Sequence, residues 1–529
     1  MQRETINLAQ AKCPVCDEYT DGNLGTHIRK VHGEEKLRQA VLAAKEQGMP
    51  DAEIGARYGI SFNHLQQIVT EAYGANVSVL KCPKCIKRWQ PKDFGEETTT
   101  VWSFKQRGDW ATHDGRYRGN WSPYIPRNVI LKYSKPGEVV LDYFVGSGTT
   151  AVEAKLLGRR CIARDINPGA IGITLENLSF TPPRYLFGEG TLSLYEPEVS
   201  VGDARDLSDI PDNSIDLICA HPPYAGIIKY STNLEGDLSK CSVSEFLVEM
   251  GKVARESLRV LKPGGRCAIL IGDSRKAKHV VPIGFQILRV FLDAGFILRE
   301  LIIKRQHNCK TTGFWYTRSV KYNFLLLAHE YLPIFEKPIV TPVGEQMSFW
   351  EYTVPHRTVA EQVHAIEEEG LETTTVWILP KDRLEAEIKR NLMRRFAIPN
   401  GTFFDVQFGD SYRDLDVALG QTASLVYIRA PEELANEQAI TGYRTGVMKI
   451  ARQARNVLPK GAFLVVNAKD VRVGSRLWPM GLLLWEDMTM HRDFVIKEIV
   501  VVLPEGPSQS MLHEPLEIVH QYLLIYARK

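Results

Sequence analysis

Residues 139–168 limit the fold more than any other part of the 529-residue chain. An apolar run ends in Asp142, a glycine turn follows at residues 146–148, and a helical pattern then leads to a second apolar run that ends in Asp165. This order of strand, tight turn, helix and strand predicts half of a Rossmann-like α/β unit. Glycine lets the main chain approach a ligand where a β-carbon would clash. A carboxylate at the tip of the second strand suits a ribose diol, because it accepts hydrogen bonds from both hydroxyls.

Four motifs in one order resemble those of the amino-directed DNA methyltransferases, which use S-adenosylmethionine (AdoMet). VLDYFVGSGTT at residues 140–150 resembles the family's DPF-GSGT sequence, and NWSPYIP at residues 120–126 resembles the segment that closes over the methionine end of AdoMet. Asp203 looks like the strand-end acid that meets the adenine. HPPY at residues 221–224 is similar to the catalytic signature, usually DPPY, NPPY or SPPY. The resemblance covers about residues 97–338, and the motif order is similar to that of the gamma group.

The resemblance implies a fold and a set of site residues. The expected fold is a Rossmann-like AdoMet methyltransferase domain. The cofactor-binding residues that it implies are Pro123, Asp142, Phe144, Gly146, Gly148, Thr149, Asp165 and Asp203. The catalytic residues that it implies are His221, Pro222, Pro223 and Tyr224. In the family pattern, the first residue of the tetrapeptide and a proline carbonyl accept hydrogen bonds from the target amino group, and the aromatic residue stacks on the flipped base.

His221 departs from the family pattern, because Asp, Asn or Ser usually stands at this position. A neutral imidazole accepts through one nitrogen, whereas an imidazolium cannot accept at all. The target therefore stays open between cytosine N4 and adenine N6. A catalytically silent DNA-binding protein is one alternative. An RNA guanine-amino methyltransferase is another, because DINP at residues 165–168 also resembles those enzymes.

The N-terminal segment carries the spacing of a structural Zn²⁺ site. Two residues separate the cysteines of the first pair and four separate the histidines, with ten between the pairs; the expected ligands are Cys13, Cys16, His27 and His32. Thiolates from a turn and imidazoles from a helix complete a tetrahedral zinc site. Leu24 and Ile28 would supply a small core. A second pair, Cys82 and Cys85, has no partner pair, and its role stays open.

Residues 34–80 follow with two helical patterns around Gly59, which resembles a helix-turn-helix reader. Its exposed face would carry amides and an imidazole that address base edges, from Asn63, His64, Gln66 and Gln67. The alternative is a helical hairpin that only docks on the catalytic domain, since basic residues are sparse in this segment.

The last third of the chain repeats the catalytic domain in degenerate form. TTTVW recurs at residues 98–102 and 373–377, and further short landmarks recur in the same order. The second copy has no glycine turn, and RAPE at residues 429–432 stands where the first copy has HPPY. We therefore expect the second copy to keep a sheet but to bind neither AdoMet nor a flipped base.

Together these patterns predict an α/β chain with several domains. The expected boundaries are 1–33 zinc-finger-like, 34–80 helix-turn-helix-like, 81–96 CxxC linker, 97–338 catalytic methyltransferase, 339–372 linker and 373–529 degenerate methyltransferase-like repeat. The net charge of +2 is too small to attract nucleic acid to the chain as a whole. The absence of a signal core or a membrane-length apolar run, together with unpaired cysteines, favours a cytoplasmic protein. The expected partners are double-stranded DNA and, as an open point, a cognate restriction or defence nuclease, with no membrane.

Overall fold

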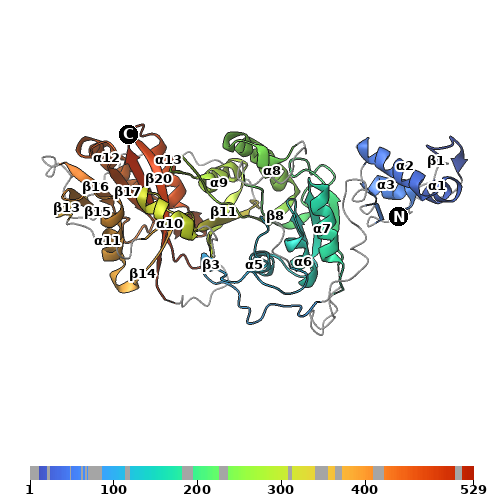
Figure 1. Ribbon diagram of the computed structural model, residues 1–529, viewed down its shortest axis with the longest axis horizontal. Coiled ribbons are helices and arrows are strands. Elements are labelled where there is room, and N and C mark those ends of the chain that lie inside the picture. Colours follow the sequence, from blue (N-terminus) through green and yellow to red (C-terminus); the bar gives the residue numbers. More distant parts are fainter. Residues whose placement is uncertain are drawn as a thin grey trace. The chain divides into compact units, whose positions relative to one another are not determined.

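The computed structural model describes most of the chain (Figure 1). The described residues are 11–20, 24–47, 49, 51–60, 64–65, 68, 86–113, 119–181, 195–224, 236–307, 312–339, 356–363, 372–408, 422–506 and 515–529. They divide into two compact units, and this division does not follow the expected boundary near residue 338. The first unit is residues 1–94, 107–241 and 255–265, and the second is residues 95–106, 242–254 and 266–529.

The N-terminal part of the first unit is a small module of short strands and helices. Its elements are β1 (Ala11–Lys12), β2 (Tyr19–Thr20), α1 (Leu24–His32), α2 (Glu34–Glu46) and α3 (Asp51–Tyr58). Leu24 and Ile28 are buried together with Leu37, Val41 and Ile54, in a cluster that also holds Cys13. The expected boundary at residue 33 is therefore wrong as a division between cores, because the zinc-finger-like segment and the following helices share one hydrophobic cluster.

The part of the chain that was expected to be catalytic carries an eight-stranded sheet. Its strand order is β3 (Val101–Ser103), β11 (Ile297–Arg305), β12 (His329–Glu336), β8 (Leu261–Ile269), β7 (Ile215–Ala220), β4 (Val139–Asp142), β5 (Arg160–Asp165) and β6 (Glu198–Val201). Strand pairs β4–β5, β5–β6 and β4–β7 are parallel, whereas β12 is antiparallel to both of its neighbours. The order reverses at β4, which has β5 on one side and β7 on the other. This is the Rossmann-like arrangement that the sequence predicted.

Helices connect the strands of this sheet. They are α5 (Tyr124–Tyr133), α6 (Thr149–Leu156), α7 (Pro168–Leu178), α8 (Val243–Val260), α9 (Ile283–Asp293) and α10 (Thr312–Lys321). The DINP sequence has a local reason at the start of α7. The side chain of Asn167 accepts a hydrogen bond from the main-chain nitrogen of Gly169, and Pro168 occupies the first helical position, where no intrahelical donor is needed.

A second, seven-stranded sheet lies in the second unit. Its order is β13 (His356–Gln362), β15 (Thr402–Phe408), β16 (Ala423–Ile428), β17 (Phe463–Ala468), β21 (Gln521–Arg528), β20 (Phe494–Pro504) and β14 (Val376–Leu379). Helices α11 (Leu384–Phe396), α12 (Glu437–Val457) and α13 (Met480–Thr489) belong to the same part of the chain. Two hairpins, β9–β10 (Ser274–Lys276, His279–Val281) and β18–β19 (Val471–Val473, Arg476–Trp478), form separate two-stranded sheets.

The two sheets share one strand plan over four strands. The order β14-β20-β21-β17 repeats β3-β11-β12-β8, with the same parallel and antiparallel pairings. Both β11 and β20 are interrupted at the same place, by a register shift just before Glu300 and Glu498 respectively. Beyond these four strands, β16 and β15 take the places of β7 and β4 with the same parallel pairing, and the plans then differ, because β13 pairs antiparallel with β15 where β5 pairs parallel with β4.

The second sheet begins earlier than expected. Residues 356–362, predicted to lie in a linker, form β13, which is antiparallel to β15. The sequence analysis missed this strand because β13 has no counterpart among the recurring landmarks. No helix in the described part of the chain is both long and apolar enough to span a bilayer.

Candidate active site and metal centre

Three acids and the HPPY sequence meet at the carboxyl ends of the parallel strands of the first unit. Asp142 ends β4, Asp165 ends β5, Asp203 follows β6 and His221 follows β7. Carboxyl ends of parallel strands lie along one edge of a sheet. In open α/β sheets, ligands bind outside this edge at the point where the strand order reverses. That point lies between β4 and β7.

The glycine turn between β4 and α6 is held by Asp165. The main-chain nitrogen of Gly146 donates to Asp165 Oδ2 at 2.9 Å, and that of Asn167 donates to Oδ1 at 2.9 Å. Gly148 has a φ of +86° and caps α6. A β-carbon at Gly148 would lie 2.9 Å from the Thr174 side chain. Gly148 is thus required for the turn and for packing against α7.

Burial changes the acidity of the strand-end acids. It raises the pKa of Asp142 to about 7, against hydrogen bonds from Thr150 and from the main chain of Phe144. Burial likewise raises the pKa of Asp165 to about 6, although the two main-chain hydrogen bonds oppose it. Without a ligand, both groups therefore bind protons well above the ordinary range of an aspartate.

His221 lies between two aromatic side chains. The Trp121 ring stacks on the imidazole, with ring centroids 5.5 Å apart and planes inclined by 23°. The Tyr224 ring meets it edge-on at 5.4 Å, and the Tyr224 hydroxyl is 3.1 Å from His221 Nε2. The HPPY sequence thus presents an imidazole whose plane and one nitrogen are already held.

The NWSP segment joins this imidazole to the glycine turn. Asn120 Nδ2 donates to Ser147 Oγ at 2.7 Å, and Asn120 Oδ1 accepts from Thr149 Oγ1 at 2.5 Å. The guanidinium of Arg107 donates to the carbonyl oxygens of Asn120 and of Trp121, at 2.7 and 2.9 Å. One short segment therefore contacts the turn through Asn120 and the imidazole through Trp121.

A buried ionic network ties this region to α6. Glu153 accepts from Trp110 Nε1 at 2.6 Å and from Arg127 at 2.9 Å, and lies 2.7 Å from His113 Nε2. Burial alone would raise the pKa of Glu153, but the contacts with His113 and Arg127 outweigh it and hold this pKa below its usual value. The carboxylate therefore stays charged and fixes α5 and the preceding loop on α6.

The pocket at this edge encloses about 790 Å³ of space, open solvent at its mouth included. Six of the predicted site residues line it: Phe144, Gly146, Asp165, Asp203, His221 and Pro223. The others do not: Pro123, Asp142, Gly148, Thr149, Pro222 and Tyr224. Pro123 caps α5, Asp142 lies buried behind the turn, and Tyr224 contacts the lining residue His221.

The sequence analysis missed further lining residues. Asp237 and Leu238, which follow HPPY in the chain, also line the pocket. No spacing rule marks them, because they belong to none of the recognised motifs. Trp121 belonged to a recognised segment, but its contact with His221 could not be read from spacing.

The lining fits AdoMet on three counts. A half-buried carboxylate, Asp165, stands at the tip of the second strand, where a ribose diol requires acceptors. Residues 144–147 of the turn line the pocket, with Gly146 at a φ of +55°. Asp203 offers a carboxylate for the adenine side, and Arg205 already contacts it at 2.6 Å.

The second sheet carries a different group at the equivalent edge. In β4–β7 Leu141 faces the fourth residue of β7, and in β15–β16 Phe404 faces the fourth residue of β16, so Asp405 matches the register position of Asp142. Arg429 follows β16 as His221 follows β7. Arg429 Nε donates to Asp405 at 2.7 Å, and Lys389 Nζ lies 3.4 Å from the same carboxylate. An ion pair thus occupies the position of the acid and of the imidazole.

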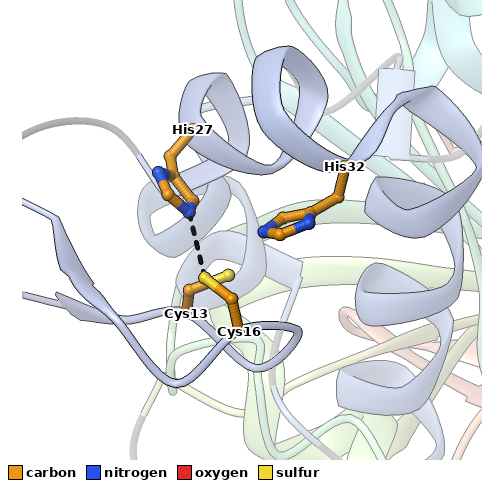
Figure 2. A group of neighbouring side chains, drawn as sticks. All are labelled: Cys13, Cys16, His27 and His32. Carbon is orange, nitrogen blue, oxygen red and sulfur yellow. Dashed lines mark hydrogen bonds between the residues drawn. The ribbon is translucent and has the colours of Figure 1, made fainter.

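The four predicted zinc ligands come together in the N-terminal module. Figure 2 shows the imidazoles of His27 and His32 directed from α1 toward the sulfurs of the β1–β2 turn. The four ligand atoms lie within 4.8 Å of one another, and Cys16 Sγ is 3.4 Å from His27 Nε2. Nε2 of His32 is shielded from solvent and has no hydrogen-bond partner among the described residues. A zinc ion with ligands at about 2.0–2.3 Å would satisfy it.

Two expectations fall outside the described residues. Of the proposed base-reading face, Asn63, Gln66 and Gln67 are not described, and only His64 is. Cys82 and Cys85 also lie outside. Helix-turn-helix recognition and the role of the second cysteine pair therefore stay predictions.

Known proteins match parts of this chain. The tRNA (guanine(10)-N2)-dimethyltransferase of Methanothermobacter thermautotrophicus is 34% identical over 132 residues, which cover 25% of this chain and 34% of that protein. The Type II methyltransferase M2.DpnII of Streptococcus pneumoniae is 37% identical over 87 residues, covering 16% of this chain and 31% of its own. The chain thus spans about a third of the length of these curated relatives. The solved structure of TrmN from Thermus thermophilus aligns at 24% identity and a TM-score of 0.27, over 42% of this chain and 51% of that one.

A family model has a longer match than these relatives. The model, described as DNA methylase, matches residues 42–176 and 215–409, which are 135 and 195 residues, or 330 of the 529. This match covers more than half of the chain and includes the glycine turn, Asp165 and His221. The chain therefore belongs to the DNA methylase family of N6/N4 amino-methyltransferases.

Proposed function

We propose that this protein transfers a methyl group from AdoMet to an exocyclic amino nitrogen of a base in double-stranded DNA, cytosine N4 or adenine N6. The observation that carries the proposal is that His221 and the Asp165-anchored glycine turn line one pocket. A methyl donor held by the turn would then lie beside the residue that receives the amino group.

An exocyclic amino nitrogen is a weak nucleophile, because its lone pair is delocalised into the ring of the base. The enzyme must extrude the base and hold its nitrogen in line with the methyl group, since methyl transfer demands correct geometry. AdoMet, when bound, supplies an electrophilic methyl group on a sulfonium. In this chain, neutral His221 and the carbonyl of Pro222 accept from the amino group, and Tyr224 stacks on the extruded base.

The contacts of His221 suit this task. The Tyr224 hydroxyl lies at Nε2 in the absence of a base, and the amino group takes its place when Tyr224 turns to stack. His221 can then hold the proton that leaves the amino nitrogen. Trp121 stabilises the resulting imidazolium, because a cation over an indole face is attracted by the ring.

We further propose one AdoMet site per chain. Asp165 accepts from the ribose hydroxyls and Asp203 lies toward the adenine, as the family resemblance implies. In the described part of the second sheet, Asp405 stands at the register position of Asp142 and is already paired with Arg429 and Lys389, and the sequence offers no glycine turn there. The C-terminal half is thus a degenerate methyltransferase fold with no catalytic centre.

The N-terminal module is proposed to hold one structural zinc ion through Cys13, Cys16, His27 and His32, and to help the protein grip duplex DNA. Local contacts must supply this affinity, because the net charge of +2 gives no general attraction. A cognate nuclease stays a prediction.

Methyl transfer from tritiated AdoMet tests the proposed function. Full-length protein is incubated with duplex DNA that carries many sequences, and in parallel with transfer RNA. We expect label in the DNA and none in the RNA. Label in the RNA alone would replace the proposal with the guanine-amino activity named for the tRNA methyltransferase relative. No label in either, with AdoMet still bound, would favour the catalytically silent alternative.

A further inference from the structure

The second unit contains two sets of elements that follow one another in the same order. One set is β9–β10, α9, β11 and β12 of the catalytic domain, and the other is β18–β19, α13, β20 and β21. From Asp273 through α9, the equivalent residue of the second set lies 197 positions later in the chain. This shift pairs Asp273 with Asp470, Arg275 with Arg472, Gly284 with Gly481 and Arg289 with Glu486.

Equivalent residues make equivalent buried contacts within each set. Tyr331 donates to Asp273 at 3.2 Å and lies 3.1 Å from His329 Nε2. In the other set, Tyr522 donates to Asp470 and its hydroxyl lies 2.9 Å from His520 Nε2. The main-chain nitrogens of Gly284 and Gly481 donate to the same two aspartates.

Between the sets, the contacts are reciprocal. His329 Nδ1 lies 2.9 Å from Thr375 Oγ1, which precedes β14 of the second sheet. His520 Nδ1 lies 2.8 Å from Thr100 Oγ1, which precedes β3 of the first. Each histidine therefore meets the threonine of the other half.

The ion pairs cross in the same manner. Arg275 donates to Glu498 at 2.6 and 2.9 Å, and Arg472 donates to Glu300 at 2.7 Å. Both carboxylates are almost fully buried, and each follows the register shift that β11 and β20 share. When residue i contacts j′ and j contacts i′, the interface has the pattern of a two-fold symmetric dimer.

A residue on a two-fold axis meets its own equivalent. Arg289 of α9 and Glu486 of α13 are equivalent by the shift of 197, and they form a two-pronged pair with both contacts at 2.6 Å. The approximate axis therefore passes between these two side chains. Nearby, Phe285 packs edge-on against Tyr522, with ring centroids 5.9 Å apart.

We propose that the C-terminal half pairs with the catalytic half of the same chain through the face by which two methyltransferase modules would pair. The Arg289–Glu486 ion pair makes this face favour the C-terminal half over a second catalytic half. Two catalytic halves related by the same axis would set Arg289 against another Arg289. Like charges at that point oppose such a pairing, whereas Glu486 turns the contact into an ion pair. The chain is thus a dimer fused into one polypeptide, with one active partner.

The test uses the full-length chain and its melting temperature. Glu486→Arg sets arginine against Arg289, the charge arrangement of two catalytic halves, and should lower the melting temperature by about 2–4 °C more than Glu486→Gln. The exchange Arg289→Glu with Glu486→Arg should recover most of the loss, because both sides of a two-fold axis offer similar surroundings. The exchange also removes the exposed contact between Arg289 and Asp293, at 3.5 Å. Arg289→Glu alone loses the same contact and is therefore the reference for its effect on the melting temperature.

The matched control is the Arg444–Asp487 pair, which has two contacts of 2.8 Å between α12 and α13 inside the C-terminal half. The axis does not relate these positions, so exchanging their charges should not restore the melting temperature. Three outcomes would overturn the proposal. In the first, the Arg289/Glu486 exchange melts no higher than Glu486→Arg. In the second, Glu486→Arg melts no lower than Glu486→Gln. In the third, the control exchange recovers as much of the melting temperature as the Arg289/Glu486 exchange does.

Discussion

Two acids at adjacent strand ends, Asp142 and Asp165, differ in what they contact. Asp165 lines the pocket and holds the glycine turn, whereas Asp142 is buried behind it. Both have a raised pKa, so the folded chain without AdoMet binds more protons than the unfolded chain between about pH 4 and about pH 7. Stability of the ligand-free protein therefore falls as the pH rises through this window.

AdoMet binding should show the opposite trend. Only the carboxylate form of Asp165 accepts from both ribose hydroxyls, so the affinity should rise with pH until the pH exceeds about 6. Asp165→Asn should weaken binding by roughly 10–100-fold above that pH, the value of hydrogen bonds to a charged group, and should flatten the pH dependence. Titration calorimetry across this range measures both effects. Asp142→Asn is the matched control and should keep more affinity; the reverse order would contradict the assignment.

Trp121 should act on the rate rather than on the cofactor. Trp121→Ala removes the ring that stacks on His221 and should lower kcat by about three- to tenfold, the value of one aromatic pair. Trp121→Phe keeps a ring face and should recover most of the rate. The KM for AdoMet should change little, because Asn120 and not Trp121 contacts the turn. Loss of AdoMet affinity with unchanged kcat would show that Trp121 serves the cofactor instead.

At the scale of elements, the proposed zinc ion should matter most to the N-terminal module. Its core is small, and a structural zinc ion contributes folding free energy directly. The helices α1, α2 and α3 pack on the segment that carries Cys13, so losing the ion should affect all three.

Cys16→Ser should remove the zinc, which we expect at one ion per chain by metal analysis. Peptides from residues 11–60 should then exchange amide hydrogens quickly, while the sheet around β4 stays protected and AdoMet still binds. Cys241→Ser, a cysteine outside the group of four, should leave the zinc unchanged. If Cys16→Ser protein retained one zinc ion, Cys82 and Cys85 would become the first alternative ligands.

The elements also show where the sequence was informative. Local patterns placed β4, the turn, α6 and β5, because apolar period, glycine and a strand-tip acid all lie within residues 139–168. They assigned Asp142 and Gly148 to the cofactor, and only three-dimensional packing shows that both support the turn and that neither lines the pocket. Asp237 and β13 were missed because each is positioned by partners distant in sequence. The shared core of residues 11–60 was missed for the same reason.

The whole molecule combines a half that carries the expected AdoMet-binding residues with a half in which none are expected. Short landmarks such as TTTVW indicated the repeat, and the shared strand order and register shift now describe it structurally. The crossing ion pairs between the halves could not be foreseen, since the sequence gives no register between strands so far apart.

One AdoMet per chain should bind at saturation, because Arg429 and Lys389 fill the second edge. Calorimetry of the full chain gives this number directly. Arg429→Ala frees Asp405 but supplies neither a glycine turn nor a second strand-tip acid, so it should not add a site. Two AdoMet molecules bound per wild-type chain would contradict the interpretation that the C-terminal half has no AdoMet site.

The most direct measurement of the central claim is mass spectrometry of nucleosides from DNA treated with the protein and AdoMet. The account predicts N4-methylcytosine or N6-methyladenine. It also predicts that His221→Ala forms this product roughly 10²-fold more slowly, in line with the loss of one preorganised polar contact, while AdoMet binds normally. DNA that carries only 5-methylcytosine, or a His221→Ala protein as fast as wild type, would contradict the account.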